Sequence, residues 1–106
     1  MNSVQRRLFR AFVQAGGDLT RDGEVDRLIQ QVNASVWVMP PKIKRALELA
    51  LHADERQRYG DLVSQLSLEE QGEVSEPAFR QRVSRGLRML EGEIRSRTWV
   101  RGEVAA

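Results

Sequence analysis

Apolar residues recur along this chain at steps of three and four, the spacing that places side chains on one face of an α-helix. The clearest case is the stretch 75–94, which predicts one long amphipathic helix. Ser75 is a favourable N-cap residue, and Pro77 is tolerated in a first helical turn. The apolar face of this helix is formed by Phe79, Val83, Leu87, Leu90 and Ile94.

The same spacing predicts four earlier helices, over residues 3–15, about 24–35, about 41–53, and from 54 to 64 or 66. Gly16-Gly17 ends the first of them, and a polar turn leads to the second. Two helices joined by a loop of this length are expected to pack as an antiparallel hairpin. The chain is therefore predicted to be all-α, a small bundle of about five helices.

Three units follow from this pattern: an N-terminal helical hairpin over 1–36, one compact helical unit over 37–101, and a loose tail over 102–106. Between the first two units, the apolar run 36–39 is too short for a helix and is expected to seat Trp37 in the core. Trp99 is expected to fold back onto that core.

Several side chains suggest where helices start and turn. Ser3 and Asp54 are candidate N-caps for the first and fourth helices. Ser67 with Glu70 has the spacing of a capping box, and Gly72 marks a turn before the last helix.

Composition places the chain among ordinary water-soluble domains. Its 106 residues are 41% hydrophobic and 30% charged, with no cysteine, which excludes disulfides and thiolate chemistry. No apolar run approaches the roughly 20 residues of a membrane span, and the N-terminus lacks the apolar core of a signal peptide. We expect a cytoplasmic protein without a membrane partner.

Charge is distributed unevenly, although the formal net charge is only +2. Arginines crowd the last quarter of the chain, and the side of the 75–94 helix opposite its apolar face is rich in them. A surface of this kind attracts a polyanion, but it is also compatible with a solvated face of a helix that only packs a core. The positions on or beside this side are Ala78, Arg80, Gln81, Arg82, Arg85 and Arg88.

The turn between the first two helices partly matches a calcium-binding loop. Its first, third, fifth, sixth and ninth positions are Asp18, Thr20, Asp22, Gly23 and Asp26. The twelfth position, which should carry a bidentate glutamate, is Ile29. We therefore interpret the segment as a polar turn and expect no metal site.

No pattern predicts catalysis or a cofactor. The chain has no glycine-rich phosphate loop, and its single histidine, His52, has no cysteine or second histidine with which to bind a metal. We expect His52 at the surface, and the protein not to be an enzyme.

Two stretches carry a resemblance to a known family. Residues 39–50, MPPKIKRALELA, resemble the "LPPK…R…L…L" opening of region four in bacterial sigma factors, especially the extracytoplasmic-function type. Residues 59–63, YGDLV, stand where that family has its "SYEEIA" scaffold helix. Residues 75–90 resemble its recognition helix, "TVKSRLSRAREKL", through the matches Ala78, Phe79, Arg80, Arg82, Val83, Ser84, Arg85 and Leu90.

The resemblance, which spans about residues 39–97, implies a helix-turn-helix that binds promoter DNA and the flap of RNA polymerase. It implies that Ala78, Gln81, Arg82 and Arg85 face bases or phosphates, and that Lys42 and Lys44 touch the DNA backbone. The side-chain chemistry of Gln81 and Arg85 also fits contacts with bases, because glutamine can pair with adenine and arginine with guanine. Arg80 and Arg88 are better suited to phosphates, which give affinity without sequence preference.

The chain also departs from the family. Residues 67–74 are expected to insert extra length and acidic charge between the scaffold and recognition helices, and no region-two segment is recognisable. The DNA-binding hypothesis requires that the arginine side of the last helix be open, not locked in salt bridges to the glutamates upstream. The alternative is a protein-interaction domain that engages RNA polymerase or an anti-sigma partner without specific DNA binding. The oligomeric state is left open.

Overall fold

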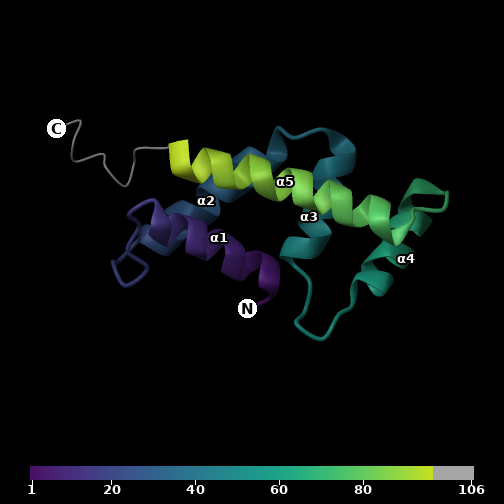
Figure 1. The fold of residues 1–106 in the computed structure, drawn as a ribbon, viewed down its shortest axis with the longest axis horizontal. Helices are drawn as coiled ribbons and strands as arrows, with labels where there is room; N and C mark the ends of the chain where they lie inside the picture. Colours follow the sequence, from purple (N-terminus) through teal and green to yellow (C-terminus); the bar gives the residue numbers. More distant parts are fainter. Residues whose placement is uncertain (97–106) are drawn as a thin grey trace.

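Five helices and no strand make up residues 1–96, the part of the chain that the computed structural model describes (Figure 1). This confirms the predicted all-α bundle. None of these helices has the apolar length of a membrane span. The helices are α1 (Ser3–Gln14), α2 (Glu24–Trp37), α3 (Pro41–Leu51), α4 (Tyr59–Glu70) and α5 (Glu76–Ser96).

Helix α5 is the element around which the others are arranged, because it packs against each of the other four (Figure 1). Its apolar face is buried as the spacing predicts, at Phe79, Val83, Leu87, Leu90 and Ile94. Gly86 is buried on the same helix, where it lies against Ile43 and Leu47 of α3. One face of α5 is thus committed to the core, which leaves the opposite face for solvent or a partner.

Helix α1 is capped by Asn2, so the prediction that Ser3 would be its N-cap is wrong. The Asn2 side-chain oxygen accepts a hydrogen bond from the Gln5 N–H at 2.8 Å. Its amide group donates to the carbonyls of Ala50 and Ala53, at 3.1 and 3.0 Å, which ties the start of α1 to the end of α3. Helices α1 and α2 each pack more closely against α5 than against each other.

The prediction that Trp37 lies in the core is wrong. Helix α2 does not stop at residue 35 but continues through Trp37, and the residues that it buries include Leu28, Val32 and Val36. Trp37 follows directly after this buried row, on a different side of the helix, and is 73% exposed. The Lys44 ammonium lies 3.8 Å from the centre of its ring.

Helix α4 starts later than predicted. The Asp54 carboxylate accepts a hydrogen bond from the Arg56 N–H at 3.1 Å and so shapes a turn, and the helix begins at Tyr59. His52, just before this turn, is exposed as predicted.

The link between α4 and α5 is shorter than predicted. Helix α4 continues to Glu70, and Ser67 caps no new helix: its hydroxyl accepts a hydrogen bond from the Val74 N–H at 3.0 Å. Gln71 ends the helix in a left-handed conformation, with φ of 54°. Only residues 71–75 connect the two helices, because the first half of the expected insertion over 67–74 belongs to α4. The predictions for Trp99, for the chain end of the helical unit and for the tail fall outside the described residues.

Candidate nucleic-acid interface

The start of α5 is fixed by the capping chemistry that the sequence predicts. The Ser75 hydroxyl accepts a hydrogen bond from the Ala78 N–H at 3.2 Å, and its carbonyl accepts one from Phe79 at 3.0 Å. The short connection then holds α4 and α5 together as a helix, a tight turn and a second helix. This arrangement presents the first half of α5 at one end of the bundle (Figure 1).

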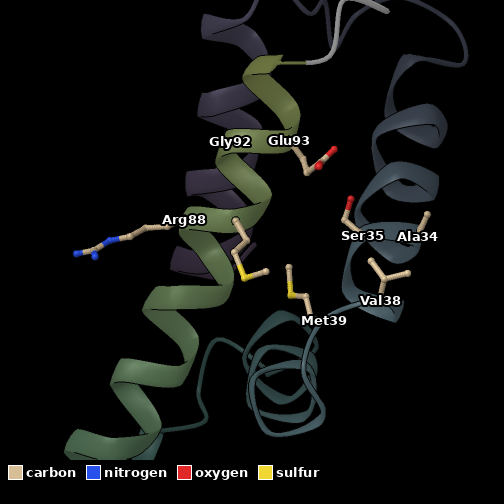
Figure 2. A pocket seen from close by; sticks show the side chains of 8 residues that line it. Ala34, Ser35, Val38, Met39, Arg88, Gly92 and Glu93 are labelled. Atoms are coloured by element: carbon tan, nitrogen blue, oxygen red, sulfur yellow. The ribbon is translucent and has the colours of Figure 1, made fainter.

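Gln81, Arg85 and Arg88 form an exposed stripe along α5, at the spacing of four and three residues that stacks side chains on one face. Within residues 1–96, none of the three has a hydrogen-bond or ion-pair partner among the contacts of the structure. Figure 2 shows Arg88 extending away from α2 and from the body of the protein. We call these three residues the open stripe. It offers a ligand two guanidinium groups and one side-chain amide.

Arg80 is exposed but has two partners. Its guanidinium donates to the Glu76 carboxylate, at 2.8 Å for the shorter contact, and lies 4.6 Å from the centre of the Tyr59 ring. An exposed pair of this i, i+4 type contributes only about 0.3–0.5 kcal/mol. A phosphate could replace Glu76 as the partner of Arg80 at little cost.

Arg82 is held more firmly, by a residue at the end of α4. Its guanidinium donates to the Glu70 carboxylate at 2.7 Å, and the two side chains are only 20% and 27% exposed. This contact joins α4 to α5 across the turn. The charge of Arg82 is therefore neutralised by Glu70 within the bundle. The DNA-binding hypothesis requires unpaired arginines on this side of α5. Arg85 and Arg88 meet this requirement, and Arg82 does not.

The remaining predicted contact residues are not gathered with the open stripe by any contact in the structure. Ala78 is half-buried against the core. Lys42 is exposed on the first turn of α3, whereas Lys44 is half-buried beside Trp37. Lys44 is thus partly engaged, and Lys42 is the more accessible of the two lysines.

Acidic groups surround the turn between α4 and α5. Glu69 accepts two hydrogen bonds from Arg45 of α3, at 2.7 and 2.8 Å, and this lowers the pKa of the Glu69 carboxyl. Glu70 and Glu76 each form an ion pair with an arginine, as described above, whereas the exposed Glu73 has no ion-pair partner within residues 1–96. Most of the acidic charge here is therefore matched by arginine, which reduces its repulsion of a phosphate backbone.

The loop between α1 and α2 folds as a polar turn. The Asp18 carboxylate accepts hydrogen bonds from the Thr20 hydroxyl at 2.5 Å and from the Thr20 N–H at 2.9 Å, which lowers the pKa of Asp18. Within residues 1–96, no three acidic, histidine or cysteine side chains gather so that they could hold a metal ion.

Comparison of the chain with protein-family models, with curated proteins and with solved structures gave no match.

Two features of this surface were not predicted from the sequence. The Arg80–Glu76 pair has the i, i+4 spacing of a helical ion pair, so the sequence contained a signal for it. The Arg82–Glu70 pair joins residues twelve apart across a turn, which local spacing does not predict. The contact follows only from the length of α4 and from the path of the turn.

Proposed function

We propose that this protein is a transcription regulator with a helix-turn-helix similar to region four of sigma factors, which binds promoter DNA, RNA polymerase or both. In this proposal α4 is the scaffold helix and α5 is the helix that enters the major groove. The observation that carries the proposal is the open stripe: Gln81, Arg85 and Arg88 share one exposed face of α5 and are not engaged within residues 1–96. Such a regulator would act in the cytoplasm, where bacterial DNA lies.

Each member of the stripe has a role that its chemistry suggests. Arg85 and Gln81 lie nearer the start of α5, where a recognition helix meets base edges, and would pair with guanine and adenine. Arg88, one turn further along, would contact a phosphate, and Arg80 would join it after exchanging Glu76 for a phosphate. Lys42 would touch the backbone from α3.

The test is DNA binding by the full chain, with its preferred sequence first selected from a random duplex pool. We expect Arg85→Ala to weaken binding to the selected duplex by about 1–3 kcal/mol and to relax the preference at one base pair. Arg21→Ala, which removes one exposed arginine from the loop between α1 and α2, is the matched control and should change affinity little. Equal effects of the two variants, or no sequence enriched from the pool, would overturn the DNA-binding part of the proposal.

A second candidate function is favoured by the pairing of Arg80 and Arg82 with glutamates, which reduces the charge available to DNA. The same helices would then bind RNA polymerase or an anti-sigma partner without reading DNA. This function predicts that the protein retains polymerase or a regulator from native lysate equally with and without nuclease. Loss of the retained protein after nuclease treatment would instead favour the DNA-binding function.

A further inference from the structure

A hollow lies between α1, α2 and the end of α3, and none of the residues of the candidate nucleic-acid interface lines it. Its volume is about 370 Å³. Helices α1 and α2 pack more closely against α5 than against each other, which leaves this space between them. Six apolar residues form most of its lining: Leu8, Phe9, Leu28, Ile29, Val32 and Leu51.

The apolar lining runs from the core of the protein out to its surface. Leu8 and Leu28 are 4% and 3% exposed and form the floor of the hollow, whereas Ile29 is 48% exposed and lies at its rim. Phe9 is half-buried beside the core. A ligand can therefore reach apolar surface here without opening the core. The volume falls within the range of about 300–1,000 Å³ that is usual for sites that bind small molecules.

Three polar side chains complete the lining, and two of them are free to bind a ligand. Gln5 is already used, because its amide donates to the Leu51 carbonyl at 2.7 Å and its side-chain oxygen accepts from the Asn2 N–H at 3.0 Å. Within residues 1–96, the side chains of Asn33 and His52 have no hydrogen-bond partner. A side-chain amide and a neutral imidazole can each donate and accept a hydrogen bond, so either residue can bind a hydroxyl group.

The lining of the hollow carries no fixed charge. Among the described residues, no carboxylate, ammonium or guanidinium group lines it. A charged ligand would lose hydration there without gaining a fixed counter-charge, whereas an uncharged ligand would not. A groove between α2 and α5 differs in this respect, because Arg88 and Glu93 both line it (Figure 2). The chemistry of the hollow therefore suits an uncharged and mostly apolar molecule.

We infer that the hollow binds a small uncharged molecule with an apolar body and one hydroxyl group. The body would bury its surface against Leu8, Ile29 and Leu51, and burial of apolar surface would supply most of the affinity. The hydroxyl group would form a hydrogen bond with Asn33 or His52. The inference goes beyond the proposed function and does not depend on DNA binding.

The test compares octan-1-ol, octanoate and octylammonium, which share one aliphatic chain and differ in the charge of the head group. Each is titrated into the full ¹⁵N-labelled chain, and the amide signals are followed by NMR. We expect octan-1-ol to shift the signals of Phe9, Ile29 and Asn33 saturably. Octanoate and octylammonium should bind at least about tenfold more weakly, because their charges would lose hydration. The signals of Met89 and Gly92, in the groove between α2 and α5, should not move.

The absence of a saturable shift up to the solubility limit of octan-1-ol would overturn the inference, and so would shifts confined to Met89 and Gly92. Binding of octanoate or octylammonium as tight as that of octan-1-ol would overturn the assignment of an uncharged ligand.

Two matched variants test the position of the site. Ile29→Glu should weaken octan-1-ol binding by about tenfold, because it removes apolar surface and adds a charge at the rim. Val13→Glu is the control, because Val13 is 50% exposed on α1 and does not line the hollow. It should leave binding unchanged, and circular dichroism should show both variants folded. Equal weakening by the two variants would overturn the site.

The hydrogen bond to the hydroxyl group has its own test in Asn33→Leu and His52→Phe. Both variants keep a side chain of similar size but remove its hydrogen-bonding groups. At least one of them should weaken octan-1-ol binding by about two- to tenfold, the usual contribution of one hydrogen bond. Unchanged binding in both variants would overturn the role of the hydroxyl group.

Discussion

Gly86 lies in the middle of α5 and faces α3. A Cβ atom at this position would lie 2.8 Å from Leu47 Cδ2, 3.2 Å from Ile43 Cγ2 and 3.3 Å from Leu47 Cβ. Leu47 is fully buried, so it has little room to move away. The missing side chain of Gly86 therefore lets the two helices that contribute most to the core approach each other.

We expect Gly86→Ala to destabilise the protein by roughly 1–2 kcal/mol. Overpacking of a core costs about 1–3 kcal/mol, and the better helix propensity of alanine returns up to about 1 kcal/mol. Gly92→Ala is the control on the same helix, because nothing lies within 4 Å of a Cβ placed there. It should be stabilising by about 0.5–1 kcal/mol. Urea unfolding followed by circular dichroism measures both, and the same sign for both variants would contradict this account.

Trp37 shows why the sequence predicted most of the core but not every member of it. Leu28, Val32 and Val36 are spaced by four, and the structure buries all three. Trp37 is one residue out of phase with this row, which turns its side chain by about 100° around the helix. The prediction was wrong because it ended the helix at residue 35 and judged the following apolar run by composition. The phase of the helix would have placed Trp37 outside.

At the scale of elements, α4 was the hardest helix to predict, and its length decides the geometry of the candidate site. Its position between α3 and α5 was predicted, but both of its ends were misplaced. The sequence 64–70 has few apolar residues to signal a continuing helix. Its last turn is stabilised instead by tertiary ion pairs, from Glu69 to Arg45 and from Glu70 to Arg82. Such contacts depend on the fold and cannot be predicted from local spacing.

The Arg45–Glu69 pair predicts how stability depends on pH. The hydrogen bonds from Arg45 lower the pKa of Glu69 below its ordinary value of 4.5. The unfolded chain then binds the proton more tightly, so the pair stabilises the fold above about pH 4.5 and is lost as the pH falls through the lower pKa of the folded state. We expect Glu69→Gln to lower the melting temperature at pH 7 but not at pH 2.

Glu73→Gln serves as the control, because Glu73 is exposed in the same turn region and has no ion-pair partner within residues 1–96. It should leave the melting temperature nearly unchanged at both pH values. A loss at pH 2 equal to that at pH 7 for Glu69→Gln would show that the side chain stabilises α4 by packing and not by its charge.

For the whole molecule, the arrangement around α5 determines which part of the candidate site could be predicted. The structure buries the predicted apolar face of this helix and leaves Gln81, Arg85 and Arg88 exposed on its other side. Helical periodicity alone was enough for this separation. The balance of charge was not predictable in the same way, because it depends on which glutamates reach which arginines after α3, α4 and α5 have packed.

That balance leads to a prediction about Glu76. Replacing Glu76 with glutamine removes an anion beside the side of α5 that we propose binds DNA, and it releases Arg80 from its ion pair. We expect Glu76→Gln to raise affinity for the selected duplex and to steepen its salt dependence by up to about 0.9 in the slope of log K against log salt, the increment for one new phosphate contact. Asp22→Asn changes the net charge equally but lies between α1 and α2, and it should raise affinity less and leave the slope unchanged. If both variants bind alike, the gain reflects net charge alone, and Arg80 does not contact the DNA.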